Sequence, residues 1–213
     1  MATLDLDAVE LHYDDRGEGI PAFLFISGEA SNRRTWQPQI EDLSRDHRCV
    51  ACDRRGTGDS SATPPFSLAQ DVDDAEALVR ALGLERLIVV GHRLGGLTAL
   101  LLNERLPDVI VGVVIGDTPL SPHGIRPADL AQLVRSAPNP AALAERFTAS
   151  TTSAEARTAV IEAFGSSSPG PSADFVESCE LDAERIRELV RAADRKPFMA
   201  LWPAAAVTDG TLL

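Results

Sequence analysis

The amino-acid sequence predicts an α/β fold built on a largely parallel sheet. Along the first 120 residues, short apolar segments with the length of strands alternate with longer segments of helical periodicity, which is typical of α/β proteins. Several apolar segments, such as residues 87–90 (Leu-Ile-Val-Val), have no polar face, as expected of strands covered by helices on both sides. With 213 residues, the chain is long enough for one domain with a substantial core and short for two.

The expected elements follow one another at short spacing. Residues 3–15 are polar and predict a pair of hairpin strands. The segment 68–82 predicts a helix, because its apolar residues recur on one helical face; they are Val72, Ala75, Leu78, Val79 and Leu82. The other elements before residue 120 are expected as strands at 22–26, 48–53, 87–90 and 109–115 and as helices at 36–43 and 94–106.

Beyond residue 120 the composition changes. Proline, serine and alanine dominate up to residue 196. Short amphipathic helices are expected at 127–136, 140–149, 153–164 and 182–193, with a loop at 166–172. One more strand is expected at 197–202. The chain therefore divides into a core part at 1–119, a helical insertion at 120–195 and a last core strand with its tail at 196–213.

Charge and cysteine usage limit the function classes. The net charge of −12 argues against nucleic acid or an anionic membrane as a partner, since both repel acidic surfaces. No apolar run is long enough to span a bilayer, and the acidic N-terminus has no leader pattern, so we expect a cytoplasmic protein. Cys49 and Cys52 have C-x-x-C spacing within an expected strand, which places them on opposite faces. We therefore expect small buried hydrophobes there and no metal or cofactor.

One motif stands where chemistry is expected. Residues 91–96 (Gly-His-Arg-Leu-Gly-Gly) connect an expected strand to an expected helix, which is the context of a nucleophile elbow, G-x-S-x-G, with Arg93 in the serine position. The turn is so tight that the residues two before and two after its middle residue must lack bulky side chains. The middle residue is expected in a strained backbone conformation that points its side chain into the site.

Four segments in order make the chain resemble the α/β-hydrolase family, in its esterase and epoxide-hydrolase branch. They are residues 23–28, a strand ending near the family's His-Gly; Thr35-Trp36, a helix start; residues 53–60, the D-x-R-G-x-G-x-S loop; and residues 89–96, the elbow. The resemblance covers residues 7–118 well and 196–203 weakly. It implies that 120–195 form a helical cap and that the core is truncated after its seventh strand.

The site departs from the family pattern. A serine hydrolase needs a nucleophile, a general base and an acid that orients the base, and a guanidinium that stays protonated cannot serve as the nucleophile. The resemblance implies a base histidine on a loop after an eighth strand, where this chain has already ended. The histidines present are His12 and His47, in a hairpin and a loop, His92 beside the elbow, and His123 at the start of the cap, from which it could enter the pocket.

The resemblance also implies an oxyanion hole made by the backbone N–H groups of Leu94 and Glu29, the latter following Gly28. Ser27 replaces the family's histidine, and Glu29 either pairs with Arg93 across the pocket or stays solvated.

Two further carboxylates occupy positions at which the family places its acid. Asp117 follows the sixth core strand and Asp209 follows the seventh; each is either the acid or a structural turn residue.

Three hypotheses remain open. In the first, the chain is a non-hydrolytic member of the family that binds a small anionic molecule at Arg93. In the second, it is an enzyme of other chemistry in which Arg93 polarises a carbonyl or holds a carboxylate. In the third, it is a truncated relic of a hydrolase. An active esterase would need a nucleophile that the sequence does not offer. The strand at 197–202 is expected to leave a bare sheet edge, which favours a homodimer through that strand.

Overall fold

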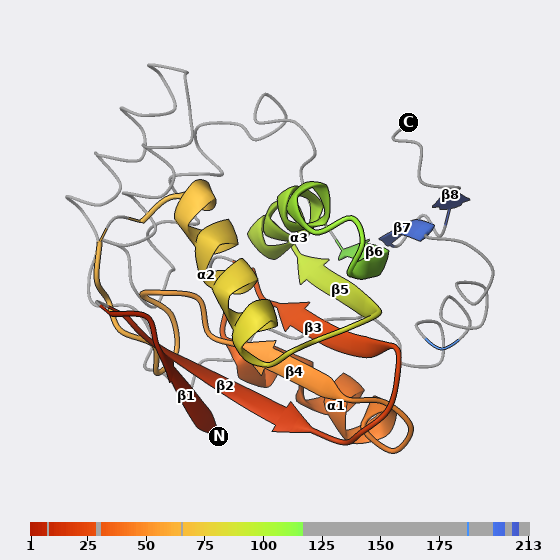
Figure 1. Cartoon of the computed structure of the whole chain (residues 1–213), viewed down its shortest axis with the longest axis horizontal. Coiled ribbons are helices and arrows are strands. Elements are labelled where there is room, and N and C mark those ends of the chain that lie inside the picture. Colours follow the sequence, from red (N-terminus) through yellow and green to blue (C-terminus); the bar gives the residue numbers. More distant parts are fainter. Residues whose placement is uncertain are drawn as a thin grey trace.

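Eight strands form one sheet in the order β1-β2-β4-β3-β5-β6-β7-β8 (Figure 1). The structure, a computed structural model, describes residues 1–7, 9–28, 31–64, 66–116, 187, 198–202 and 206–208. The strands are β1 (Ala2–Asp5), β2 (Glu10–Arg16), β3 (Ala22–Ile26), β4 (Cys49–Cys52), β5 (Leu87–His92), β6 (Ile110–Gly116), β7 (Phe198–Trp202) and β8 (Ala206–Thr208). The helices are η1 (Arg33–Trp36), α1 (Gln37–Leu43), α2 (Leu68–Ala81) and α3 (Leu94–Arg105).

The predicted α/β fold is confirmed, and up to residue 116 the elements lie close to their expected positions. The helix expected at 36–43 instead begins earlier, as the 3-10 turn η1, and continues as α1. Asn32 caps η1, because its side chain accepts a hydrogen bond from the N–H of Arg34 at 3.0 Å. Pro38 lies in the first turn of α1, where its missing N–H costs least, and this fixes where the α-helix begins.

Parallel pairing brings several turns to one edge of the sheet. Strands β3, β4, β5, β6 and β7 pair in parallel, whereas β1 and β2 are antiparallel additions at one side. Ile26 at the end of β3 lies opposite Cys52 of β4 and Gly91 of β5. The turns that follow β3, β4 and β5 therefore meet at the carboxyl edge of the sheet, where ligands bind in open α/β sheets.

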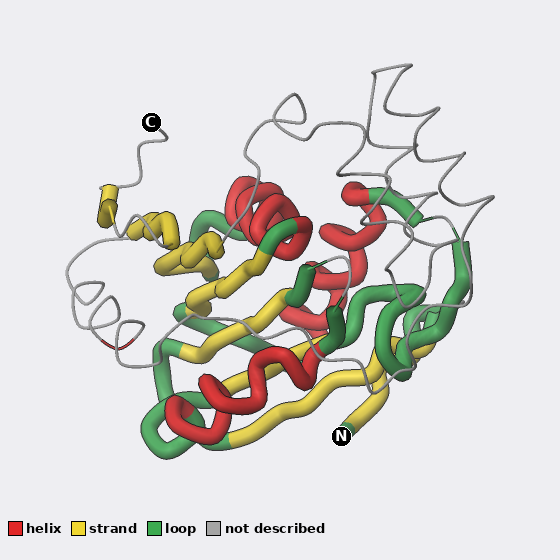
Figure 2. The backbone as a smooth tube through the Cα atoms, turned by 180° about the vertical axis from the view of Figure 1, so that it is seen from behind, coloured by secondary structure: helices red, strands yellow, loops and turns green. Residues whose placement is uncertain are grey.

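Helices cover both faces of the sheet. Figure 1 shows α2 and α3 on one face, and the view from behind in Figure 2 brings α1 to the front. Cys52 belongs to the core on the α2 and α3 side, whereas Cys49 belongs to the core with Trp36 on the other side. The prediction that the two cysteines lie on opposite faces is confirmed, and burial raises the pKa of each thiol to about 12.

The expectation that residues 197–202 leave a bare sheet edge is wrong. Strand β8 pairs antiparallel with β7, with Met199 opposite Thr208 and Leu201 opposite Ala206. Only three positions, 203–205, separate the two strands in the sequence. A parallel crossover needs a dozen or more residues, which explains why β8 pairs antiparallel with β7. The homodimer expected through this edge stays a prediction.

The predicted helical insertion lies almost wholly outside the described residues. Within it the structure describes only Arg187, in helical conformation, which is ion-paired with the Asp42 side chain and donates to the Asp42 carbonyl at 2.9 Å. The loop expected at 166–172 also lies outside the described residues. Among the described helices, none has the length and apolar character needed to cross a membrane.

Candidate functional site

The turn between β5 and α3 has the geometry of a nucleophile elbow. Arg93 adopts φ 50° and ψ −119°, a conformation that residues with a side chain rarely occupy. Hydrogen bonds hold the turn on both sides: the Arg93 N–H donates to the Gly116 carbonyl at 2.8 Å, and the Arg93 carbonyl accepts from the Gly96 N–H at 2.9 Å. The predicted strained elbow is therefore present, with arginine at its middle position.

Close backbone contacts explain the glycines of the elbow. A Cβ atom on Gly91 would lie 2.4 Å from the Gly95 carbonyl oxygen, and one on Gly95 would lie 2.2 Å from the Ile26 carbonyl oxygen. Both distances are far below van der Waals contact, and both neighbours are backbone atoms that cannot move aside without moving the sheet. The prediction that these two positions must lack bulky side chains is confirmed, and the contacts leave no room even for a methyl group.

Arg93 lies beside the turn that follows β3. Its side chain is partly exposed, whereas the preceding His92 is buried. A Cβ atom on Gly28 would lie 3.3 Å from the Arg93 Cβ, so Gly28 and Arg93 are neighbours across the site. Leu94 begins α3, so its N–H and the positive end of the helix dipole lie next to Arg93.

The turn after β3 is held by hydrogen bonds of its own. Ser27, which replaces the histidine that the family resemblance implies, is buried and donates from Oγ to the Asn32 carbonyl at 2.7 Å. The Ser31 N–H donates to the Gly28 carbonyl at 3.3 Å. Gly28 and Leu94, two of the predicted oxyanion-site residues, are thus brought together with Arg93. That Leu94 donates to a bound oxyanion remains a prediction.

The other predicted site residues lie outside the described part of the chain. These are Glu29, Asp117, His123 and Asp209, and their roles as ion-pair partner, acid or pocket histidine stay predictions.

Three histidines are described. His12 Nε2 is 2.9 Å from a Glu10 carboxylate oxygen, and His47 Nδ1 is 3.1 Å from the Pro21 carbonyl oxygen. The third, His92, is buried next to the elbow.

Sequence reasoning missed a set of buried ion pairs between the loop after β4 and helix α2. The loop after β4 places Arg54 and Arg55 in the interior, and α2 supplies a carboxylate for each. Arg54 Nη1 lies 3.2 Å from Asp71 Oδ2, and Arg55 donates from Nε and Nη2 to the two oxygens of Asp74, both at 2.6 Å. All four side chains are buried. A signal was available, because Asp71 and Asp74 fall on the same helical face as the apolar residues of α2.

Asp53 is the centre of a second ionic cluster in the same loop. Its carboxylate is ion-paired with the Arg33 side chain and accepts from the Arg33 and Asp59 N–H groups at 2.6 and 2.9 Å. Gly58 has φ +54°, and a Cβ there would lie 2.1 Å from Asp53 Oδ2. The second glycine of the D-x-R-G-x-G-x-S pattern therefore makes room for the carboxylate that begins it.

The pKa values of Asp53 and Asp59, the two aspartates of this cluster, shift in opposite directions. Burial raises the pKa of Asp53, although its hydrogen bonds and Arg33 oppose the shift. The hydrogen bond from Arg33 lowers the pKa of Asp59. Among the described residues, no group of three or more His, Cys, Asp or Glu side chains is arranged to hold a metal ion.

Strand order, elbow and glycine loop together define a hydrolase-type α/β protein. A model of the alpha/beta hydrolase fold family matches residues 21–158. The chain belongs to this family.

Named relatives agree on the superfamily and differ in substrate. The chain is 40% identical over 102 residues to "Putative carbamate hydrolase RutD" of Cronobacter sakazakii, covering 46% of this chain and 37% of the relative. It is 32% identical over 127 residues to "sn-1-specific diacylglycerol lipase ABHD11" of Mus musculus, covering 58% of this chain and 41% of that protein.

A solved epoxide hydrolase, VrEH1 from Vigna radiata, is 30% identical with a TM-score of 0.53, over 62% of this chain and 42% of that chain. The present chain thus spans less than half the length of each of the three relatives. Their names describe a carbamate hydrolase, a diacylglycerol lipase and an epoxide hydrolase, so family membership alone selects no substrate.

Proposed function

We propose that this member of the family does not hydrolyse substrates through its elbow residue and instead binds a small anionic molecule at Arg93. The observation that carries the proposal is the identity of the elbow residue, Arg93. Arginine occupies the middle position of a turn whose strained backbone and flanking glycines are those of a nucleophile elbow.

The chemistry of guanidinium supports the loss of nucleophilic catalysis. Covalent catalysis at an elbow needs a side chain that can lose a proton and attack. The guanidinium of arginine stays protonated at any physiological pH and offers only donors. Arg93 therefore cannot form the acyl intermediate of a serine hydrolase.

The surroundings of Arg93 support anion binding. The side chain is partly exposed, so a solute can reach it, and the N-terminus of the twelve-residue helix α3 begins at the next residue. A helix N-terminus and a guanidinium both favour negative charge. Glu29 and Asp117 are internal competitors for Arg93 by their sequence positions. A guanidinium has five N–H donors, so one carboxylate neighbour does not exhaust its capacity.

The proposal predicts that carboxylates or phosphate stabilise the protein through Arg93. At a concentration ten times the dissociation constant, a ligand adds about 1.4 kcal/mol, which is a rise of roughly 3–6 °C in Tm for a chain of this size. We expect acetate, malonate or inorganic phosphate to produce such a rise in the wild type and not in Arg93→Ala. Differential scanning fluorimetry, followed by calorimetric titration of any active anion, makes the measurement.

Arg86 provides a matched control. It is a second arginine at positive φ, 48°, and it is exposed at the start of β5, at the opposite edge of the sheet from Arg93. Arg86→Ala removes the same charge from the whole molecule, so it should leave the anion response intact. An equal response in Arg86→Ala and Arg93→Ala, or none in the wild type, would contradict the proposal.

The proposal also predicts no serine-type esterase activity. The wild-type protein should hydrolyse short activated esters, such as p-nitrophenyl acetate, no faster than an equal concentration of the Arg93→Ala variant does. Loss of triad members reduces kcat by on the order of a million-fold in a studied protease. Arg93→Ser should not gain activity, because the family resemblance places the base histidine on a loop after an eighth strand. Of the described histidines, His12 and His47 are held at other contacts and His92 is buried on β5 beside the elbow. Multiple turnover that a serine-directed phosphonate abolishes would show the proposal to be wrong.

A further inference from the structure

We infer that Arg54 is a positioning residue for the Arg93 site: it ties helix α2 to the turn after β3 and thereby fixes Gly28 against the elbow. The pattern D-x-R-G-x-G-x-S prescribes an arginine at position 55 and leaves position 54 open. The contacts below are therefore a property of this chain's own residue. Only the effect on anion affinity rests on the proposed function.

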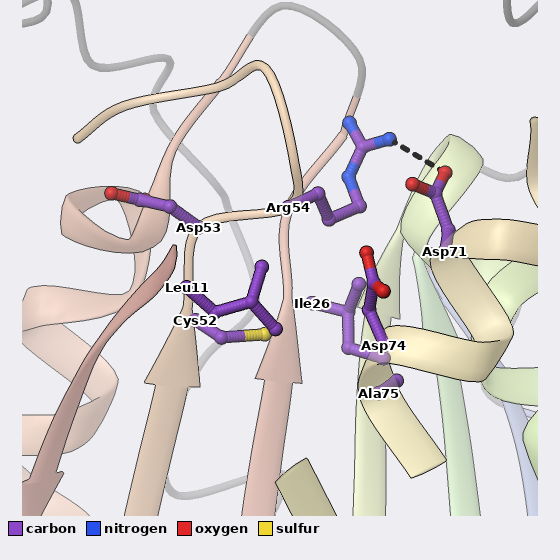
Figure 3. A pocket seen from close by; sticks show the side chains of 8 residues that line it. All are labelled: Leu11, Ile26, Cys52, Asp53, Arg54, Asp71, Asp74 and Ala75. Carbon is purple, nitrogen blue, oxygen red and sulfur yellow. Dashed lines mark hydrogen bonds and ion pairs between the residues drawn. The ribbon is translucent and has the colours of Figure 1, made fainter. Parts of the chain in front are cut away.

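The contacts of Arg54 join three separate segments. From the loop after β4, its Nη2 donates to the Gly28 carbonyl at 2.6 Å and its Nη1 to Asp71 Oδ2 at 3.2 Å. The Arg54 and Asp71 side chains are 3% and 0% exposed, so water competes for neither bond. Figure 3 shows the Arg54 side chain extending from its loop toward Asp71 on α2. The planar guanidinium of arginine suits this role, because it directs two N–H donors to two acceptors at once.

Gly28 is the residue through which this contact reaches the site. Its carbonyl accepts from both Arg54 and the Ser31 N–H, and a carbonyl oxygen has two lone pairs. Both are thus used, which fixes the orientation of the peptide. The same glycine adjoins the elbow, since a Cβ there would lie 3.3 Å from Arg93 Cβ and 3.4 Å from His92 Nδ1. A shift of Gly28 would therefore change the space beside Arg93.

A small cavity lies beside the guanidinium. Its volume is about 10 Å³, and the charged residues among those that line it are Asp53, Arg54, Asp71 and Asp74 (Figure 3). Within the described part of the chain, Nε of Arg54 is buried without a hydrogen-bond partner, and a cavity of this size is about the minimum for one water. Arg54 is therefore held by its two Nη contacts and not by tight packing on every side.

The experiment compares Arg54 with its neighbour. Arg55 is an equally buried arginine with its own α2 carboxylate. Its hydrogen bonds to described residues go to Asp74 and the Thr63 carbonyl, whereas those of Arg54 go to Asp71 and the Gly28 carbonyl. Arg54→Met and Arg55→Met each remove one buried ion pair, so both should lower global stability. Only Arg54→Met should loosen the turn after β3.

Amide hydrogen exchange at Ser31 is the decisive readout, because the Ser31 N–H donates to the Gly28 carbonyl. Site-resolved exchange is measured by NMR, and each value is corrected for the change in global unfolding free energy from urea titration. After this correction we expect Ser31 to exchange about tenfold faster in Arg54→Met, through local opening, and unchanged in Arg55→Met. Equal corrected protection in the two variants would overturn the inference.

Two additions keep the test decisive. If Arg54→Met does not fold, Arg54→Lys takes its place, because lysine keeps the charge beside Asp71 but cannot fork between two acceptors; it should show the same selective loss at Ser31. Phosphate or acetate affinity should also fall several-fold in the Arg54 variants and not in Arg55→Met. A wild type that binds neither anion would defeat the proposed function, and the Ser31 comparison would still decide the role of Arg54.

Discussion

The turns after β4 and β5 lie at the same edge of the sheet and both carry arginine, but the fold treats the arginines differently. After β4, Arg54 and Arg55 are buried and paired with Asp71 and Asp74 of α2. After β5, Arg93 remains partly exposed on a backbone at φ 50°. The first turn uses arginine to join a strand to a helix, and the second presents it to the site.

The difference teaches that position, and not residue type, decides what an arginine does. A buried guanidinium needs a carboxylate from another element, because leaving the charge unpaired in the interior costs several kcal/mol. Helix α2 meets this need by placing two aspartates on its buried face. At the elbow the backbone itself, held by Gly91 and Gly95, determines where the side chain begins.

The largest expected effect comes from breaking the elbow. In Gly95→Ala the added Cβ would lie 2.2 Å from the Ile26 carbonyl oxygen and 2.7 Å from that of Ser27. Because β3 would have to move, we expect a loss of more than about 4 kcal/mol of unfolding free energy, or no folded protein.

Gly83→Ala is the control for this variant. Gly83 has φ +58° and nothing within 4 Å of an added Cβ, so only backbone strain of about 1 kcal/mol is expected. Urea unfolding of both variants makes the comparison. A Gly95→Ala protein as stable as Gly83→Ala would show that the elbow tolerates a side chain and that its geometry is not tightly determined.

The next effect contrasts the arginines directly. Arg55→Met leaves Asp74 buried without the partner that holds both of its oxygens, and we expect a loss of about 3–5 kcal/mol. Arg93→Met removes a partly exposed side chain, whose contacts water screens, and we expect a loss of at most about 1 kcal/mol. The midpoints and slopes of urea unfolding provide both numbers. If Arg93→Met proves as costly as Arg55→Met, Arg93 is a structural residue and the contrast between the turns disappears.

Much of the fold could be predicted from the sequence because it depends on local patterns. Helix α2 follows from the spacing of Val72, Ala75, Leu78 and Val79, which are buried as expected. The opposite placement of Cys49 and Cys52 follows from the twofold period of a strand. The elbow glycines follow from the tightness of one turn. Each of these inferences needs only residues close together in the chain.

The ion pairs and the last strand could not be predicted in the same way. Arg54 and Asp71 are 17 residues apart, and Arg33 and Asp53 are 20 apart. A charged residue in a loop is ordinarily expected in solvent. The aspartates on the apolar face of α2 indicate that a buried cation lies nearby, but only the arranged strands show that Arg54 and Arg55 are those cations. Strand β8 is three residues long, too short for a periodic pattern to be seen. The contact between Gly28 and Arg93 likewise exists only because β3 and β5 are paired.

The smallest expected effect concerns the acid stability of the loop after β4. Arg33 donates to Asp59 Oδ2 at 2.8 Å, and this hydrogen bond lowers the pKa of Asp59 below its ordinary value of 3.8. In the unfolded chain the pKa returns to about 3.9, so between the two values the unfolded state binds more protons. Asp59 therefore stabilises the fold above about pH 4, and this contribution is lost as pH falls through the folded pKa.

Asp59→Asn removes this contribution. Urea unfolding at steps from pH 7 to pH 2 should show the variant less stable than the wild type at neutral pH and the difference closing toward pH 2. Taking the difference matters because Asp53, whose pKa burial raises, has the opposite pH dependence and remains in both proteins. Arg34→Ala is the comparison, since Arg34 lies 3.9 Å from Asp59, its side chain is 39% exposed, and it lowers the pKa of Asp59 less than Arg33 does. Its stability between pH 7 and pH 2 should therefore depart less from that of the wild type than the stability of Asp59→Asn does. A constant difference between Asp59→Asn and wild type at every pH would mean that Asp59 acts through its shape and not through its charge, and the ionic account of this loop would then rest on its buried pairs alone.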